Sequence, residues 1–328
     1  MKTVSPFWKH FLKTWLVIGG VAYLVRLAYV MSGQLDWGAI RARPGVFGII
    51  VVLLTANLVS QFLSWLWIVR RGATTLSLVE GYRSFSAALL SRYLPAGKLF
   101  QFVGMHQFTV NPADRVNATY SLMQLTLVTL IAGFIAALPG VGLIVHRPLI
   151  FIFGGTILLV AGLGVYQRWG GRILRKFSSR FAAIDESQRM GVSMFATLLA
   201  ANVFFSWGFF SISGLLSLSL IGVSPSWNDL PFVLSSHFLA FLGGAAAVVV
   251  PAGLGVRDGI FIALLKVRYL PAQAIWMALA VRLFGIFAEM VFVAPFLVQR
   301  VRSQNPLRTI GPNKSAGLEK FAESRKLG

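Results

Sequence analysis

The chain contains no cysteine, which excludes both disulfide bonds and thiolate metal sites. Its four histidines, at positions 10, 106, 146 and 237, show none of the spacings of metal-binding motifs. It also lacks paired carboxylates, a glycine-rich nucleotide loop and a lysine-containing phosphate loop. We therefore expect no metal, no cofactor and no enzymatic activity.

Charged residues are scarce as well, at 12% of the 328 residues, whereas apolar residues make up 56%. Soluble domains carry about 25% charged and about 45–50% apolar residues. With a mean hydropathy of +0.74, the composition predicts an all-α polytopic membrane protein. The net charge of +20 would suggest nucleic acid binding in a soluble chain. Here the basic residues gather in a few loops and both tails, which favours a membrane and anionic lipid as partners, and no nucleic acid.

We expect roughly six to eight transmembrane helices in one domain, residues 1–298, followed by a disordered basic cytoplasmic tail, residues 299–328. The continuous apolar stretches are residues 15–31, 46–69, 118–138, 149–166, 192–221 and 274–298. The first resembles a signal peptide, but Arg26 interrupts the region where cleavage would occur, so we interpret it as a retained span. Pro139 and Gly140 predict a turn after the third stretch.

Residues 168–189 repeat a basic side chain every four positions beside an apolar face. This pattern is typical of an amphipathic helix lying in the headgroup plane on the cytoplasmic side. A solvated loop helix is the alternative.

Two further apolar stretches, residues 82–106 and 230–270, are interrupted where a membrane span should continue. The interruptions contain the helix-breaking residues Pro95, Gly97, Pro251, Gly253 and Gly255. Unpaired backbone groups are costly in hydrocarbon, so such breaks persist only where they pack in protein or line a wet cavity. Either each stretch is a re-entrant hairpin, or each is a single kinked span.

The distribution of Lys and Arg predicts the orientation. Both termini, residues 70–83 and residues 168–189 are basic and belong inside, whereas residues 222–229 contain no Lys or Arg and belong outside. Hairpins would then enter from opposite faces, as in inverted-topology repeats that form a midplane binding site. Lys266 and Arg268 fall outside, against the rule.

Seven ionisable residues lie in these apolar stretches or their breaks: Arg26, Arg92, Lys98, Arg257, Asp258, Arg282 and Glu289. A charge at the bilayer centre costs at least about 2.5 kcal/mol, so each is expected to be functional or paired. Snorkelling is the alternative for Arg26 and Lys98. Asp258 could pair with Arg282.

The excess of basic over acidic groups predicts an anionic ligand. Helices that begin after Pro95 and Pro251 would direct their free N–H groups into the same zone, where a phosphate would fit. The glycines would let the backbone approach it, or they merely permit tight hairpin packing. His237 follows two serines in an apolar stretch, a pattern that favours helix contacts over catalysis.

Three motifs carry a family resemblance: residues 92–97 (Arg-Tyr-Leu-Pro-Ala-Gly), 250–258 (Val-Pro-Ala-Gly-Leu-Gly-Val-Arg-Asp) and 280–283 (Ala-Val-Arg-Leu). Together they resemble the flippase-like transmembrane domain of lysylphosphatidylglycerol synthases. Ala252 replaces a glycine usual in that family, Asp258 a glutamate, and Lys98 follows the first motif in place of its usual continuation. The resemblance implies a stand-alone member without the aminoacyltransferase domain, in a bacterial or archaeal plasma membrane.

Three functions remain open at this point. The first is a flippase-like transporter for an anionic or modified phospholipid, glycolipid or polyprenyl-phosphate headgroup. The second is a non-transporting accessory subunit of a lipid-modifying enzyme or glycosyltransferase. The third is a small-anion transporter.

Overall fold

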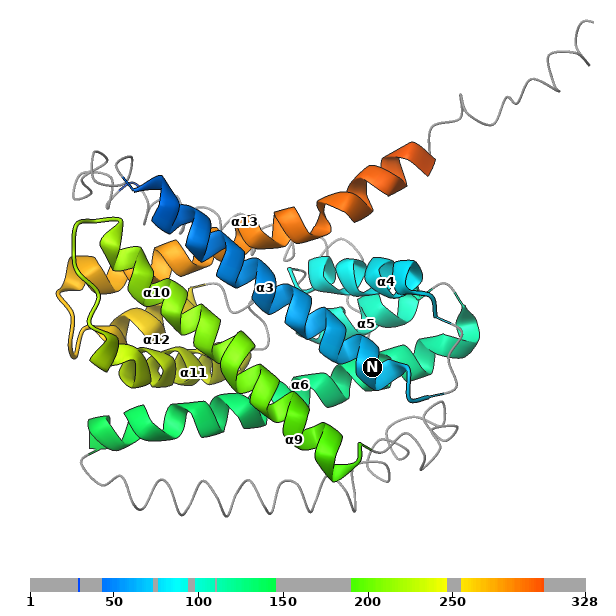
Figure 1. Ribbon diagram of the computed structural model, residues 1–328, viewed down its shortest axis with the longest axis horizontal. Helices are drawn as coiled ribbons and strands as arrows, with labels where there is room; N and C mark the ends of the chain where they lie inside the picture. Colours follow the sequence, from blue (N-terminus) through cyan, green and yellow to red (C-terminus); the bar gives the residue numbers. More distant parts are fainter. Residues whose placement is uncertain are drawn as a thin grey trace, which may run out of the picture.

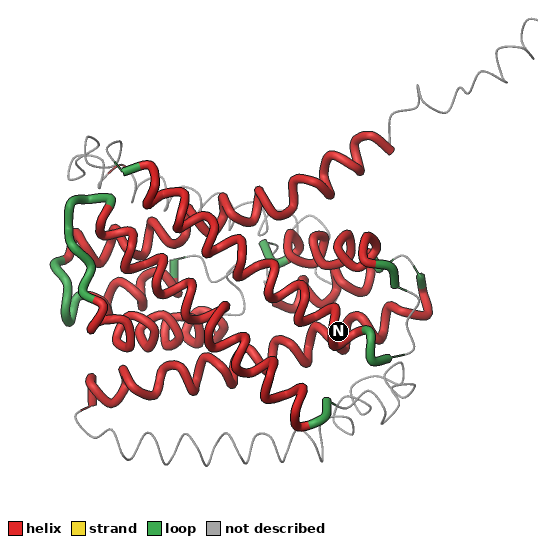
Figure 2. The backbone as a smooth tube through the Cα atoms, viewed as in Figure 1, coloured by secondary structure: helices red, strands yellow, loops and turns green. Residues whose placement is uncertain are grey.

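The computed structural model describes Tyr29 and residues 43–72, 76–93, 98–109, 111–145, 190–246 and 255–303, and within these ranges the fold is all-α (Figures 1 and 2). Four helical segments are long and apolar enough to cross a membrane. They are α3 (Pro44–Val69), α6 (Pro112–Val145), the continuous segment of α9 (Val192–Ala201), η4 (Asn202–Gly208) and α10 (Phe209–Ser219), and α13 (Pro271–Ser303). The chain is therefore an all-α polytopic membrane protein. The stretches predicted at residues 15–31, 149–166 and 168–189 lie outside the described residues, apart from Tyr29.

Both interrupted stretches form helical hairpins. In the first, α4 (Leu78–Ser91) packs side by side with α5 (Lys98–Phe108). In the second, α11 (Leu230–Ala246) packs in the same way with α12 (Val256–Leu265). The halves of a kinked span would run end to end, so that alternative is wrong. Each break falls in the chain between the two packed halves of a hairpin.

The hairpins enter from opposite ends of the molecule. At one end, the Arg43 Nη1 group at the start of α3 donates to the Ser219 carbonyl at the end of α10, over 2.8 Å. At the other end, the Asn117 side chain in α6 donates to the Val69 carbonyl at the end of α3. Because α4 follows α3 and α11 follows α10, the two hairpins start at opposite ends (Figure 1).

Among the described elements, the order is span, hairpin, span, and this order occurs twice. Helix α4 packs against α13, and the corresponding helix of the second half, α11, packs against α6. Likewise α5 packs against α6 as α12 does against α13, while α3 and α10 pack on each other. Each of these contacts in the first half therefore has a counterpart in the second half, as expected of an inverted repeat.

Helix α6 continues through Pro139 and Gly140 to Val145, so the turn predicted there is wrong. Proline is tolerated inside membrane helices where neighbouring groups stabilise the freed backbone. The carbonyl that Pro139 leaves without its helix partner is that of Ile135, and in the same turn the Ser235 hydroxyl of α11 donates to the Ala137 carbonyl over 2.6 Å. A Cβ at Gly140 would lie only 2.1 Å from the Pro231 carbonyl oxygen, so α11 packs directly on this part of α6. Packing between the halves holds the helix together where its sequence alone predicts an end.

Helix α3 carries two side-chain amides one turn apart, at Asn57 and Gln61. Asn57 is buried, and its side-chain oxygen accepts a hydrogen bond of 2.8 Å from Gln61 one turn later. This hydrogen bond pairs a donor of Gln61 with an acceptor of Asn57 inside one helix, where lipid tails offer no partner.

Candidate functional site

The tip of the first hairpin is bound to the last span. Arg92 and Tyr93 form the turn after α4, and both donate to Glu289 of α13. The Arg92 guanidinium forms an ion pair with one carboxylate oxygen, and the Tyr93 hydroxyl lies 2.6 Å from the other. Glu289 is buried, and each of its two carboxylate oxygens accepts a hydrogen bond from the first hairpin, which lies far from it in the sequence.

The second hairpin places a charged pair at the start of α12. Gly255 has a φ of +83°, a backbone conformation that favours glycine, and the helix begins at the next residue. Asp258 is buried and accepts from the Gly255 N–H over 3.4 Å, which puts a carboxylate at the positive end of the helix. Asp258 forms no ion pair with Arg282 among the described residues, so the pairing considered from the sequence is not present.

Arg257 projects from the first turn of α12 into an aromatic environment. Its Nη2 lies 2.5 Å from Nε2 of His237 on α11. Its guanidinium carbon lies 5.2 Å from the ring centre of Phe210 and 5.7 Å from that of Phe241, both within cation–π range. The charge of Arg257 is thus stabilised by π-faces and an imidazole, while no carboxylate among the described residues forms an ion pair with it.

Arg282 of α13 completes a cluster of three guanidinium groups. Its charge and that of Arg92 both act on Arg257, and Arg282 acts on Arg92 as well. Within the described part of the chain, the Nε and Nη2 atoms of Arg282 are buried and have no hydrogen-bond partner. Buried donors left unpaired cost about 1–3 kcal/mol each, more when charged. The cluster therefore presents free, charged donors that an anion would satisfy.

Charge and geometry together favour binding of an anion. Three arginines face two carboxylates, and both carboxylates are already engaged, Glu289 with Arg92 and Asp258 with the start of α12. A phosphate or carboxylate could accept two parallel hydrogen bonds from Arg282, the strongest arrangement available to a guanidinium.

The structure brings together five of the residues predicted from the sequence, from both hairpins and the last span. They are Arg92, Arg257, Asp258, Arg282 and Glu289. Gly255 forms the turn beside them, and Lys98 is the first residue of α5, although its side chain is not described. Pro95, Gly97, Pro251 and Gly253 lie outside the described residues.

Sequence reasoning missed Tyr93 and His237 as members of the site. Tyr93 stands beside Arg92 in the first motif, so its position was a usable signal. His237 lies seven residues before Gly244, which places both on one face of α11. The interpretation of the two serines before His237 as helix contacts is correct for Ser235, which bonds to α6. The hydroxyl of Ser236 is buried without a partner among the described residues.

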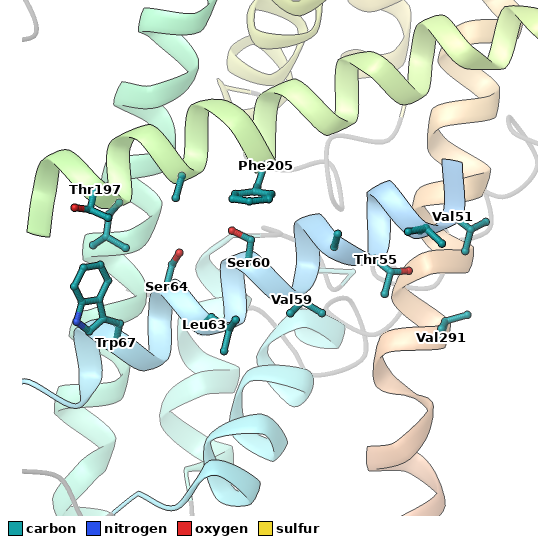
Figure 3. Close-up of a pocket in the computed structure, with 14 residues that line it drawn as sticks. Val51, Thr55, Val59, Ser60, Leu63, Ser64, Trp67, Thr197, Phe205 and Val291 are labelled. Atoms are coloured by element: carbon teal, nitrogen blue, oxygen red, sulfur yellow. The ribbon is translucent and has the colours of Figure 1, made fainter. Parts of the chain in front are cut away.

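A groove of about 890 Å³ runs along the outer face of α3 (Figure 3). Its lining is almost wholly apolar and comes from α3, α9, η4 and one residue of α13. On α3 it extends from Val51 to Trp67, roughly 24 Å at 1.5 Å per residue. Val291 is the residue of α13 that lines it, and it lies two residues from Glu289, about 200° further around the helix.

One of the two basic residues that break the charge rule at the base of the second hairpin has an acidic partner. Arg268 forms an ion pair with Asp229, with 2.6 Å between Nη1 and Oδ1, and the Tyr269 hydroxyl donates to the same carboxylate over 3.0 Å. Burial, followed by the bond to Asp229, raises the pKa of Tyr269 above its ordinary value.

Comparisons of the chain with protein-family models, with curated proteins and with solved structures give no match.

Proposed function

We propose that the chain is a flippase-like transporter that binds the anionic headgroup of a membrane lipid between its two hairpin tips. The observation that carries the proposal is the free, buried guanidinium edge of Arg282 beside Arg92 and Arg257. A phosphate is the anion that best matches three arginines, because its oxygens accept several charge-assisted hydrogen bonds at once. Arg282 is its primary contact, and Glu289 and Asp258 position the elements that carry the other two arginines.

The apolar groove on α3 favours a lipid over a small soluble anion. One leaflet of the hydrocarbon core is about 15 Å deep, so a groove of roughly 24 Å can hold an acyl chain. Two side chains along it, Val52 and Leu63, are more than half exposed and would contact lipid in a membrane. A headgroup at the arginines with a tail in the groove uses both features.

The inverted arrangement supports transport rather than a purely structural role. A headgroup held where hairpins from opposite ends meet can be exposed to either side by small movements of one half against the other. We place the protein in a bacterial or archaeal plasma membrane with both termini in the cytoplasm, as the basic loops favour.

Reconstituted vesicles test this function. Phosphatidylglycerol with a fluorescent tail is included in vesicles that contain the purified chain, and dithionite then reports the fraction of label that reaches the outer leaflet. We expect the variant Arg282→Gln to lower the translocation rate at least about tenfold, since it removes one charge-assisted contact to the phosphate.

The matched control is Arg70→Gln, which removes an exposed arginine at the end of α3 and should leave the rate unchanged. Equal rates for the native chain and Arg282→Gln would overturn the proposal. Inhibition of translocation by free phosphate, without binding of lipid, would favour a small-anion transporter instead.

A further inference from the structure

Arg257 lies against α11 rather than pointing away from it at the hairpin tip. Its Cβ is close to Gly244, where an added Cβ would approach it to 2.7 Å, while its guanidinium reaches His237. Gly244 and His237 are seven residues apart on α11, or about 10 Å along the helix axis. The side chain of Arg257 therefore extends back along α11, toward the base of the hairpin.

The contact with His237 requires one protonation state. An arginine guanidinium has only donors, so Nε2 of His237 must accept the hydrogen bond. The imidazole is then neutral, with its proton on Nδ1, and Nδ1 is buried without a partner among the described residues. A protonated imidazole donates from both nitrogens and would repel Arg257. Protonation of His237 and its contact with Arg257 are mutually exclusive.

Among the described residues, Arg257 is the charged group that contacts His237, and its other neighbours are aromatic. The imidazole stacks on Phe210 of α10 at 3.9 Å, with Trp207 of η4 at 5.3 Å and Phe261 of α12 at 5.7 Å. The charged residues of α6, Asp114 and Arg115, lie in its first turn.

That turn is roughly 30 Å from the part of α6 that packs on α11 near His237. On α13, Arg282 acts on Arg257, and Glu289 is paired with Arg92. At the base of the hairpin, Asp229 is paired with Arg268. On α12, Asp258 accepts from the Gly255 N–H and acts on Arg257. No carboxylate among the described residues forms an ion pair with His237, so a positive charge on the imidazole would act directly on Arg257.

We propose that His237 is a positioning residue that holds Arg257 back from the anion site while its imidazole is neutral, and releases Arg257 when it takes up a proton. The inference rests on the proposed function, because Arg257 must have an anion to move toward. Once released, Arg257 joins Arg282 at the headgroup, so proton uptake strengthens anion binding. This couples the protonation of one buried imidazole to the occupancy of the site.

Binding of lysophosphatidylglycerol to the full chain in detergent, measured at about pH 4 and about pH 8, tests the inference. Its phosphodiester keeps one negative charge over this range, and the lower pH is needed because burial and the charge of Arg257 both oppose protonation of His237. We expect the native chain to bind at least about tenfold more tightly at the lower pH, the gain of one charge-assisted contact.

Two variants at the same position separate positioning from packing. His237→Gln keeps a hydrogen-bond acceptor for Arg257 but cannot take up a proton, so it should bind weakly at both pH values. His237→Phe keeps the aromatic packing and removes the acceptor, so it should bind tightly at both. His237→Leu serves as a second acceptor-free variant should the phenylalanine variant fail to fold.

The possible results are distinguishable. Native pH dependence retained by His237→Gln, or binding by His237→Phe and His237→Leu as weak as that of His237→Gln, would overturn the inference. Unchanged binding by Arg282→Gln at both pH values would overturn the proposed function itself. Loss of binding in Arg282→Gln, together with opposite effects of the glutamine and phenylalanine variants, supports both.

Discussion

Among the ionisable residues of the site, Glu289 has the most complete set of partners, with Arg92 on one oxygen and Tyr93 on the other. Glu289→Gln should lower the free energy of unfolding by about 2 kcal/mol. This is below the roughly 3–5 kcal/mol of a fully buried pair, because Arg92 keeps some exposure. Thermal unfolding in detergent measures the change.

The same variant leaves the Arg92 guanidinium free, so lysophosphatidylglycerol should raise the unfolding temperature of Glu289→Gln more than that of the native chain. The control is the double variant Arg92→Met with Glu289→Gln, which removes both charges and should restore part of the lost stability without the added response to lipid. An identical lipid response in all three proteins would contradict the ion-pair assignment.

A second prediction at this scale concerns pH. The pKa of Tyr269 is raised, through burial and the bond to Asp229, above its ordinary value of 10.0. The folded state thus holds the phenol proton more tightly than the unfolded state. The stability that protonated Tyr269 contributes is complete below about pH 10, and it is lost as the pH rises toward the pKa of Tyr269 in the folded state.

Tyr269→Phe should therefore be less stable than the native chain near neutral pH, by about 1 kcal/mol for the lost hydrogen bond. Above about pH 10 this difference should shrink, because phenylalanine does not ionise. Unfolding temperatures measured against pH for both proteins test this. A constant difference across the alkaline range would show that Tyr269 titrates at its ordinary pH.

The charged residues of the site could be identified from the sequence, whereas their pairing could not. A charge in an apolar stretch is visible in the sequence because of its cost in a membrane, and this signal pointed to Arg92, Arg257, Arg282 and Glu289. Their partners depend on distances between helices that are far apart in sequence. The sequence left Asp258 free for Arg282, but the N–H of Gly255, three residues before Asp258, is the nearer donor.

At the scale of elements, the close contact between α11 and α12 depends on Gly244. A Cβ there would lie 2.7 Å from the Cβ of Arg257 and 3.4 Å from its Cα, so the helices would have to separate. Gly244→Ala should lower the free energy of unfolding by about 1–3 kcal/mol and weaken binding of lysophosphatidylglycerol by displacing Arg257.

Gly259→Ala is the matched control on α12, because nothing lies within 4 Å of a Cβ at this position. Alanine also has the higher helix propensity, so this variant should be neutral or slightly more stable. Equal effects of the two substitutions on unfolding temperature would contradict the proposed role of Gly244 in packing.

The elements themselves were largely predictable. Pro95 and Pro251 correctly predicted that helices end within the two apolar stretches, because proline cannot continue the hydrogen-bond ladder. Pro139 predicted a helix end by the same rule, and there the prediction was wrong because α11 packs on that turn of α6. The local rule is the same in all three cases, and the tertiary contacts decide the outcome. Side-by-side packing of the hairpin halves likewise required the structure.

At the scale of the whole molecule, the inverted arrangement predicts that the bases of the two hairpins face opposite sides of the membrane. The chain has no cysteine, so single cysteines can be introduced without removing native ones. Arg71→Cys, in the exposed segment before the first hairpin, should react with a membrane-impermeant thiol reagent only from the cytoplasmic side. Val267→Cys, 69% exposed at the base of the second hairpin, should react only from outside. Reaction of both from the same side would contradict the inverted arrangement.

The central claim is that Arg282, beside Arg92 and Arg257, binds a lipid phosphate, and the lipid that the protein retains tests it most directly. Native chain, Arg282→Gln and the exposed-surface control Lys266→Gln are purified under the same mild conditions, and bound lipid is counted by native mass spectrometry. The native chain and the control should each retain anionic phospholipid, and Arg282→Gln should lose most of it. Equal retention by all three proteins would contradict the claim.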